Sequence, residues 1–225
     1  MQPLLIVGTD TGVGKTVLTS SLAAYWQTHR SSQTLGIYKP IQSGEGDREF
    51  FQRTFSLSQT LEEITPIYFE TPIAPAIAAV QEGKSIDLGK IWQQFQTLQQ
   101  QKQCLLVESL GGLGSPITYE YTVADLASDW RIATVLVVPV RLGAIGQAVA
   151  NVALATLKKI DLKGIVLSCA QPCSSQDIEN FAAIDLIQSL TYVPVLGVLP
   201  HLSDPSDLSK LAHLASGLEL EVLGF

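Results

Sequence analysis

Positive charge is scarce in this 225-residue sequence: 14 Lys and Arg residues stand against 21 Asp and Glu residues, a formal net charge of −7. Duplex nucleic acid and anionic membranes attract proteins through clustered Lys and Arg side chains, which this chain lacks. The longest uncharged apolar run, residues 132–140, is much shorter than the roughly 20 residues that cross a bilayer. We therefore expect no nucleic-acid partner and no membrane association.

Cysteine and histidine are equally scarce, with three residues of each. Cys169 and Cys173 are close in sequence, but no second pair accompanies them at the spacing of a structural zinc site. Three cysteines form no even disulfide framework, and the apolar run at residues 3–7 is too short for the core of a secretory signal. These features favour a protein of the reducing cytoplasm without structural zinc.

Short apolar runs alternate along the chain with longer segments of helical period. Runs rich in leucine or β-branched residues predict buried strands at residues 4–8, 35–38, 104–108, 133–138, 164–168 and 195–199. Helices are predicted at residues 15–28, 88–101, 122–130, 145–160, 176–190 and 206–216. Asp87 and Ser206 are the expected N-caps of the second and last of these. The alternation predicts one α/β domain, residues 1–225, with helices on both faces of a mostly parallel, doubly wound sheet.

A glycine-rich loop at residues 8–16 joins the first predicted strand to the first helix. The backbone N–H groups of such a loop, with the positive end of the helix dipole, bind a polyphosphate. Lys15 adds a charge for the β- and γ-phosphates, and the Thr16 hydroxyl suits Mg²⁺. The strict phosphate-loop pattern has glycine where this chain has Thr9, but the strand, the Gly-Lys-Thr triplet and the helix occur together. The residues expected to bind the nucleotide here are Gly12, Val13, Gly14, Lys15 and Thr16.

Two further blocks follow the next two predicted strands. Residues 39–44 read Lys-Pro-Ile-Gln-Ser-Gly, and residues 107–112 read Val-Glu-Ser-Leu-Gly-Gly. With the phosphate loop, in this order and at these spacings, they resemble the dethiobiotin synthetases, a family of ATP-dependent ligases with a P-loop NTPase fold. The similarity runs from residue 4 to about residue 202.

The resemblance implies a reaction of biotin synthesis. The diamine 7,8-diaminononanoate captures CO2 as an N-carbamate, ATP phosphorylates the carbamate, and the second amine displaces phosphate to close the ureido ring. The products are dethiobiotin, ADP and phosphate. Because transfer of a phosphoryl group to a carbamate brings anionic oxygens together, the site needs cations more than it needs a general base.

The resemblance also assigns roles to residues at the strand ends. Lys15, Lys39 and Thr11 are expected to be catalytic, with Lys39 lying between the carbamate and the γ-phosphate. The residues implied for the diamine or its carbamate are Thr11, Lys39, Ser43, Gly111 and Gly112.

The resemblance implies three Mg²⁺ ligands: Thr16, Asp47 and Glu108. Glu108 ends an apolar strand, where P-loop proteins usually carry the acid linked to the metal. Asp47 lies in a run of charged residues, in which Glu45 and Glu49 are rival ligands.

Members of the family are homodimers in which a loop of the neighbouring subunit holds the substrate carboxylate. The matching segment here is residues 141–147, at a predicted helix start where free N–H groups favour an anion. Its residues expected to contact the substrate are Leu142, Gly143 and Gly146.

The expected nucleobase site departs from the family. The family often supplies an asparagine that reads adenine after its fifth strand, whereas this chain has Ser168 there. A hydroxyl cannot replace a two-headed amide, so we predict weak selectivity, with CTP or GTP accepted beside ATP. The other element that resembles a base-flanking segment is Pro200, His201 and Leu202.

Two alternatives stay open at this point. A switch ATPase of the ParA or MinD kind shares the Gly-Lys-Thr core but carries a signature lysine where this chain has Asp10, which disfavours that class. A divergent synthetase paralogue with altered activity is suggested by Ser109 and Leu110, where the family usually has Gly-Ala. Turnover of the diamine separates these alternatives from the active synthetase.

Overall fold

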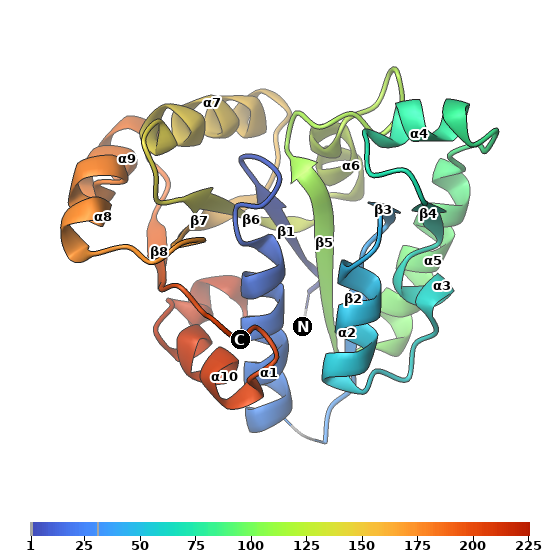
Figure 1. Cartoon of the computed structure of the whole chain (residues 1–225), viewed down its shortest axis with the longest axis horizontal. Helices are drawn as coiled ribbons and strands as arrows, with labels where there is room; N and C mark the ends of the chain where they lie inside the picture. The colour runs from blue at the N-terminus through green and yellow to red at the C-terminus, as the bar shows by residue number, and fades with distance from the viewer. Residues whose placement is uncertain (1, 31) are drawn as a thin grey trace.

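A parallel sheet of six strands forms the centre of the molecule (Figure 1). The computed structural model describes residues 2–30 and 32–225, and within this part the strand order is β2-β5-β1-β6-β7-β8. All neighbouring strands of this sheet pair in parallel, which confirms the predicted α/β fold with a doubly wound sheet. The strands are β1 Leu4–Gly8, β2 Leu35–Tyr38, β5 Cys104–Gly112, β6 Ala133–Pro139, β7 Leu162–Ser168 and β8 Val195–Leu199.

Helices cover both faces of this sheet. Helices α1 and α10 pack together on one face, and α5, α6, α7 and α9 cover the other (Figure 1). Residues of β1 therefore alternate between two buried cores, with Ile6 on the α1 side and Val7 on the opposite side. Within the described residues, no helix has the length and apolar character to cross a membrane. The helices are α1 Lys15–His29, α2 Asp47–Phe55, α3 Leu61–Ile64, α4 Pro75–Gln81, α5 Leu88–Gln101, α6 Val123–Trp130, α7 Ala144–Leu157, α8 Ser175–Phe181, α9 Ile184–Thr191, α10 Leu208–Ser216 and a final 3₁₀ turn, Leu220–Leu223.

The six predicted strands are all present, but the predicted helix at residues 176–190 is wrong as a single element. It is two helices, α8 and α9, because the backbone leaves the helical conformation at Ala182, where φ is −143°. Ile178, Ala182 and Ile184 all pack against the same core. The step of two residues from Ala182 to Ile184 does not fit a 3.6-residue period, so one straight helix would not bury all three.

The predicted N-caps have different outcomes. Asp87 caps α5 as expected, since its carboxylate accepts the backbone N–H of Lys90 at 2.9 Å. The prediction for Ser206 is wrong, because the carboxylate of Asp207 caps α10. The Ser206 hydroxyl donates instead to Asp204 at 2.6 Å, one turn before the helix.

The region between residues 41 and 81 contains several short elements that the sequence pattern did not predict. Strands β3 Ile41–Ser43 and β4 Ile67–Phe69 pair in parallel as a small second sheet, accompanied by α2, α3 and α4. Figure 1 shows this region beside the β2 and β5 edge of the main sheet. It supplies one wall of the pocket described below.

The register of three strands brings their carboxyl ends together. Ile6 of β1 pairs with Glu108 of β5, and Tyr38 of β2 pairs with Val107 of β5. Lys39, the residue after Tyr38, therefore lies beside Glu108, and both lie next to the loop that follows β1. Open α/β sheets bind ligands at this edge.

Candidate active site

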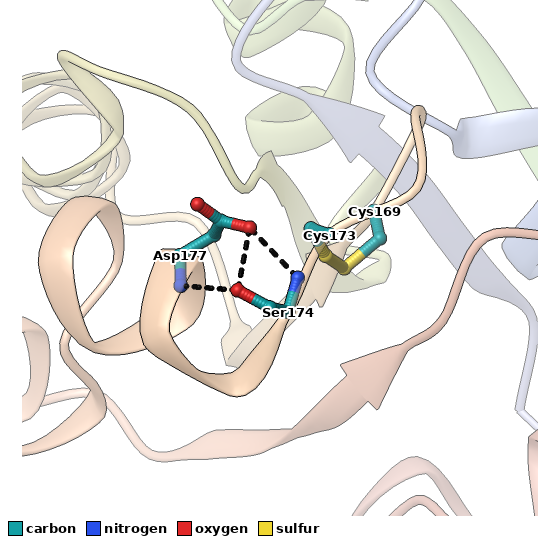
Figure 2. The surroundings of a disulfide bond; sticks show 4 residues. All are labelled: Cys169, Cys173, Ser174 and Asp177. Atoms are coloured by element: carbon teal, nitrogen blue, oxygen red, sulfur yellow. Dashed lines mark hydrogen bonds between the residues drawn. A yellow bond between two sulfur atoms is a disulfide. The ribbon is translucent and has the colours of Figure 1, made fainter.

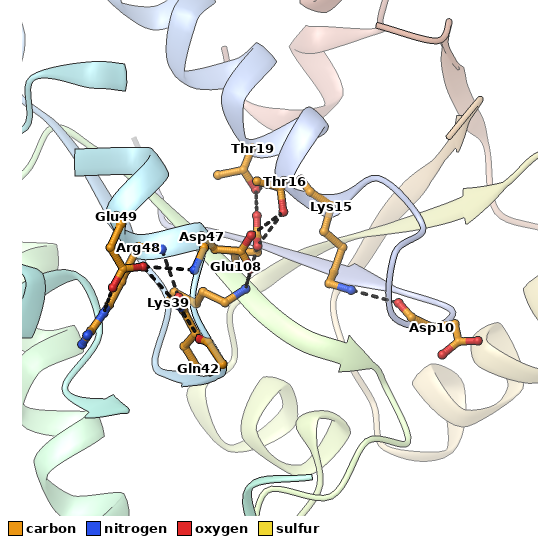
Figure 3. A network of polar contacts seen from close by, with 12 residues as sticks. Asp10, Lys15, Thr16, Thr19, Lys39, Gln42, Asp47, Arg48, Glu49 and Glu108 are labelled. Carbon is orange, nitrogen blue, oxygen red and sulfur yellow. Dashed lines mark hydrogen bonds and ion pairs between the residues drawn. The ribbon is translucent and has the colours of Figure 1, made fainter. Parts of the chain in front are cut away.

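The loop between β1 and α1 folds as a phosphate cradle. Gly14, the residue before α1, has φ +102°, a conformation that a side chain disfavours. The side chain of Lys15 folds back over the loop, and its Nζ donates to the carbonyl of Asp10 at 2.9 Å (Figure 3). Burial lowers the pKa of Lys15 to about 8, even though the Glu108 carboxylate raises it. The loop therefore holds a partly desolvated ammonium group, and a bound anion would stabilise its charged form.

Lys39 joins two carboxylates beside this loop. Its Nζ lies 2.6 Å from Asp47 Oδ2 and 2.8 Å from Glu108 Oε1, and Figure 3 shows all three side chains converging. Glu108 has no exposed surface, and Lys39 is 5% exposed. Burial works against the charge of Lys39, but Glu108 and Asp47 together outweigh it and raise the pKa of this lysine. Lys39 therefore keeps its charge at neutral pH.

The oxygen atoms around Lys39 fit Mg²⁺. Thr16 Oγ1 lies 3.2 Å from Glu108 Oε1 and 3.4 Å from Asp47 Oδ1. Mg²⁺ takes hard oxygen ligands and usually only one or two protein carboxylates, the rest being water and phosphate. A cation, the Lys39 ammonium, already lies between these two carboxylates. Across the described residues, no group of three or more His, Cys, Asp and Glu side chains is placed to hold a metal ion, so any metal here would need the hydroxyl and the nucleotide.

The two rival acids differ from Asp47 in their contacts. Glu49 accepts Nε of Arg48 at 2.6 Å and the backbone N–H of Gly46 at 3.2 Å, so it completes the first turn of α2. Glu45 lines the pocket but, within the described part of the chain, forms no hydrogen bond or ion pair with the network around Lys39, whereas Asp47 does. The geometry therefore favours Asp47 over both rivals.

A pocket of about 550 Å³ opens in front of these groups, within the usual range for small-molecule sites. Its polar end is formed by the phosphate loop, Lys39 and the two acids, and its other walls come from residues 72–75 and from the loop after β5. The predicted site residues that line it are Thr11, Gly12, Gly14, Lys15, Thr16, Lys39, Ser43, Asp47, Gly111 and Glu108.

Comparison with known proteins places this geometry in a family. A family model described as an AAA domain matches residues 2–208. The ATP-dependent dethiobiotin synthetase BioD of Gloeothece citriformis is 56% identical to this chain, with 99% of each chain covered. The chain belongs to the dethiobiotin synthetase family. The synthetase of Synechocystis is 51% identical over 100% of this chain and 95% of its own, and that of Bacillus subtilis strain 168 is 28% identical over 99% and 97%.

Solved structures of other P-loop proteins share the fold. The cell division ATPase MinD of Pyrococcus furiosus has a TM-score of 0.60 at 13% identity, covering 99% of this chain and 100% of its own. A ParA family ATPase of Chlorobium tepidum has a TM-score of 0.57 at 12% identity, covering 99% and 92%. At such low identity the likeness concerns the fold alone. Asp10, the residue that disfavoured this class in the sequence, is exposed, and its Oδ2 lies 3.5 Å from Nη2 of Arg141.

Three residues expected to contact the substrate of a dethiobiotin synthetase have distinct surroundings. The hydroxyl of Ser43 lies buried at the pocket wall and has no hydrogen-bond partner among the residues that the structure describes, so it is available to a ligand. Gly111 lines the pocket, whereas Gly112 does not. A Cβ on Gly112 would lie 2.7 Å from the carbonyl of Thr9, so this glycine lets β5 approach the phosphate loop.

The segment expected to hold the substrate carboxylate lies outside the chain's own pocket. Leu142 is 85% exposed, and open space adjoins Gly143 and Gly146 at the start of α7. The segment also contacts the phosphate loop, since Thr9 Oγ1 donates to Gln147 Oε1 at 3.4 Å. In a single copy of the chain, this segment therefore faces outward and does not line the pocket.

The residues expected at the nucleobase also lie apart from the pocket. Ser168 is 2% exposed, and a Cβ on Gly14 would lie 2.1 Å from its hydroxyl, so Ser168 packs against the phosphate loop. Pro200 and His201 are exposed after β8, and Leu202 packs against the core on the α1 side. The structure thus brings Ser168 to the back of the loop and does not show a contact between these residues and the pocket.

A disulfide joins Cys169 to Cys173 (Figure 2). The sequence analysis did not expect it, because an odd cysteine count gives no even framework. The turn after β7 brings the two Cα atoms within 6.0 Å, a usual separation for a disulfide. The bond ties the end of β7 to Ser174, which begins α8 through a capping box with Asp177.

Sequence reasoning missed two parts of the site. Thr19, one turn after Lys15 on the buried face of α1, donates to Glu108 Oε2 at 2.7 Å. A polar residue on the core face of a helix was the available signal. The segment 72–75 forms an apolar wall, and its two prolines were the only mark of a fixed turn there.

Proposed function

We propose that this chain is an ATP-dependent dethiobiotin synthetase that converts 7,8-diaminononanoate, CO2 and ATP into dethiobiotin, ADP and phosphate. One observation carries the proposal: two buried ammonium groups, two carboxylates and a hydroxyl meet at one end of a single pocket. Relatives at 56% and 51% identity that carry this name support the choice of substrates.

The phosphate loop would bind the triphosphate. In the free chain the Lys15 ammonium donates to a neutral acceptor, the carbonyl of Asp10. A phosphate oxygen is charged and forms a stronger hydrogen bond with an ammonium group. Lys15 would therefore exchange the carbonyl for the β- and γ-phosphates, while the N–H groups at the start of α1 bind the same anion.

Lys39 would act on the second anion. The substrate amine attacks CO2 and loses a proton to solvent, which leaves a carbamate. A carbamate oxygen then attacks the γ-phosphorus, and the bond between the γ-phosphorus and ADP breaks. Negative oxygens approach one another in this step, and a fixed cation between them lowers the barrier. Lys39 lines the pocket beside Lys15 and retains its proton, because two carboxylates raise its pKa.

Ring closure then forms one bond and breaks another. The second amine attacks the carbamoyl carbon, a C–N bond forms, the C–O bond to the phosphate group breaks, and the amine loses one proton to the departing phosphate or to solvent. Lys15 and Lys39 would stabilise the departing phosphate, because this group is the former γ-phosphoryl group whose negative charge they bind in the preceding step. Thr11 and Ser43, at the pocket wall, would donate hydroxyl hydrogen bonds to the carbamate or the amines.

We further propose Mg²⁺ as the cofactor, held by Thr16, Asp47 and Glu108 together with the nucleotide. Bound there, the ion would neutralise charge on the β- and γ-phosphates. The support is the set of hard oxygens within 3.4 Å of the Thr16 hydroxyl.

The apolar wall of the pocket suits the aliphatic part of the diamine. Pro72, Ile73 and Pro75 line one side, and Leu110 and Pro116 line another. A polar end and an apolar end in one pocket match a substrate with a diamine head and a hydrocarbon chain.

Among the described residues, the only lysines or arginines that line this pocket are Lys15 and Lys39, which are assigned above to the phosphates and the carbamate. We therefore propose that a second copy of the chain binds the free carboxylate of the substrate. Within residues 141–147, Arg141, Leu142, Gly143 and Gly146 are exposed and Ala144 is buried, and the segment includes N–H groups at the start of α7. A homodimer is therefore part of the proposal, supported by the outward position of Leu142. We propose the cytoplasm as its location because relatives of this chain are named as ATP-dependent synthetases.

Phosphate release with product analysis tests the proposed function. The purified chain is incubated with ATP, Mg²⁺ and bicarbonate, with and without 7,8-diaminononanoate, and dethiobiotin is detected by mass. We expect phosphate release only with the diamine, in equal amounts with dethiobiotin. Phosphate release that ignores the diamine would indicate a switch ATPase, and no release at all would indicate a paralogue that has lost the activity.

A further inference from the structure

The two carboxylate oxygens of Glu108 have separate partners. Oε1 faces the pocket, where it accepts Nζ of Lys39 at 2.8 Å and lies 3.2 Å from the Thr16 hydroxyl. Oε2 faces helix α1, where Thr19 Oγ1 donates to it at 2.7 Å. Figure 3 shows Thr16 and Thr19 of α1 both directed at this carboxylate, each next to one of its oxygens. Glu108 and Thr19 are both fully buried.

The Thr19 hydroxyl has one proton and two acceptors within reach. Glu108 Oε2 lies at 2.7 Å and the carbonyl of Lys15 at 3.0 Å. Hydrogen bonds to a carboxylate are shorter and stronger than those to a neutral carbonyl. The hydroxyl proton therefore points to Glu108, and the carbonyl of Lys15 is the weaker of the two acceptors.

Thr28, on the same helix, gives the ordinary pattern for comparison. Its hydroxyl donates to the carbonyl of Ala24 at 2.8 Å, the usual bond to the residue four positions earlier. Among the described residues, the Thr28 hydroxyl forms no hydrogen bond to an acidic side chain. The bond from Thr19 to an acid 89 positions away is therefore a feature of the site and not of the helix.

We infer that Thr19 is a positioning residue that fixes the orientation of Glu108, so that Oε1 is presented to Lys39 and to the metal. Rotation about the last side-chain torsion of a glutamate is only weakly restricted. Without the hydroxyl, Oε2 would be a buried charged oxygen with no donor, and the carboxylate would turn toward whichever donor remained. The metal part of this inference rests on the proposed function.

Three variants test the inference: Thr19→Val, which keeps the shape and removes the hydroxyl, Thr19→Ser, which keeps the hydroxyl, and the control Thr28→Val. The affinity for Mn²⁺, used as a paramagnetic probe for Mg²⁺, is measured on the full chain with ADP present. Loss of an interaction that orients a metal ligand typically costs 10- to 100-fold in affinity, so we expect Thr19→Val to bind Mn²⁺ about tenfold more weakly. Thr19→Ser should restore the affinity, and Thr28→Val should leave it unchanged.

Steady-state kinetics give a second readout. Thr19→Val should raise the Mg²⁺ concentration needed for half-maximal rate by a similar factor, with a smaller change in kcat, and thermal unfolding shows that each variant is folded. If Thr19→Val binds Mn²⁺ as the wild type does, or if Thr28→Val loses as much, the inference is overturned. If Thr19→Val does not fold, an affinity in Thr19→Ser equal to that of the wild type supports the inference, and a tenfold loss there contradicts it. A wild-type chain that binds Mn²⁺ but makes no dethiobiotin would contradict the proposed function alone.

Discussion

The two sides of the phosphate loop are built in different ways. On the β2 and β5 side, Lys39, Asp47, Glu108 and the Thr16 hydroxyl form one connected and largely buried network. On the β7 and β8 side, the residues expected to flank the nucleobase are exposed, packed on the core or packed against the loop, and a disulfide joins Cys169 to Cys173. We call these the phosphate side and the base side.

The difference shows where binding energy can be concentrated. Electrostatic interactions are strong where water is excluded, and each buried ion depends on its partners. The phosphate side therefore has large effects at single residues. The base side has one small hydroxyl and a covalent link, so changes there should have smaller effects.

The largest effect is expected when an ammonium group is removed from the phosphate side. Lys39→Ala or Lys15→Ala should each lower kcat/KM by ~10²-fold or more, because a preorganised cation for transition-state charge is worth several kcal/mol. Diamine-dependent phosphate release measures this. Lys84→Ala, which removes a half-exposed lysine paired with Glu82, is the matched control and should retain full activity. Near-normal turnover by Lys39→Ala would show that the network only stabilises the fold.

A pH titration sharpens the comparison through Lys15. Burial lowers its pKa to about 8 in the free chain, and a bound polyphosphate favours the charged form. Nucleotide affinity should therefore fall as the pH rises above about 8, with proton uptake on binding. Calorimetry in two buffers of different ionisation enthalpy measures that uptake. Lys15→Arg, whose side chain stays protonated throughout, should show none.

The lowered pKa of Lys15 also makes the free energy of unfolding depend on pH. Between pH about 8 and the ordinary lysine value of 10.5, the unfolded chain binds more protons at this residue than the folded chain does. The contribution of Lys15 to the free energy of unfolding therefore becomes more favourable to the folded chain as the pH rises from about 8 to 10.5. The measurement is the free energy of unfolding of the nucleotide-free wild type and of Lys15→Met between pH about 8 and 10.5. If the wild type becomes less stable relative to Lys15→Met as the pH rises, the lowered pKa is contradicted.

The same contrast explains which parts of the structure the sequence could predict. The six main strands are apolar on both faces, so residues such as those of β1 were predictable from their run alone. Lys39 was predictable as a site residue because it directly follows β2, and Lys15 because it ends the glycine-rich loop between β1 and α1. The bond from Thr19 to Glu108 was not, because it joins residues 89 positions apart through packing that no local pattern records.

Short elements and turns account for the other failures. Strands β3 and β4 have three residues each, too few for a period to be visible. The break at Ala182 carries no glycine or proline, and only the shared burial of its neighbours explains it. The disulfide depends on the turn that brings Cys169 and Cys173 together, which the cysteine count cannot show.

Removing the disulfide should have a moderate effect on stability. Its closed loop has a sequence separation of only four, for which the chain-entropy relation gives about 2 kcal/mol. The double variant Cys169→Ser with Cys173→Ser should lower Tm accordingly, with little change in diamine-dependent turnover. Dithiothreitol should lower Tm of the wild type and leave the double variant unaffected. Three free thiols in the denatured, unreduced protein would show that the bond is not formed in solution.

The smallest effect is expected for the choice of nucleotide. Ser168 is the one hydroxyl that the sequence places near a base, and in the structure it lies against Gly14, behind the loop. A single neutral hydrogen bond contributes about 1 kcal/mol, so the preference for ATP over CTP or GTP should stay within about tenfold in competition binding. Ser168→Ala should leave the ratios unchanged, because its hydroxyl does not line the pocket. A preference for ATP of a hundredfold or more would mean that the base side recognises adenine through backbone groups. The two sides would then differ in the kind of group that binds the nucleotide, and not in how much binding energy each contributes.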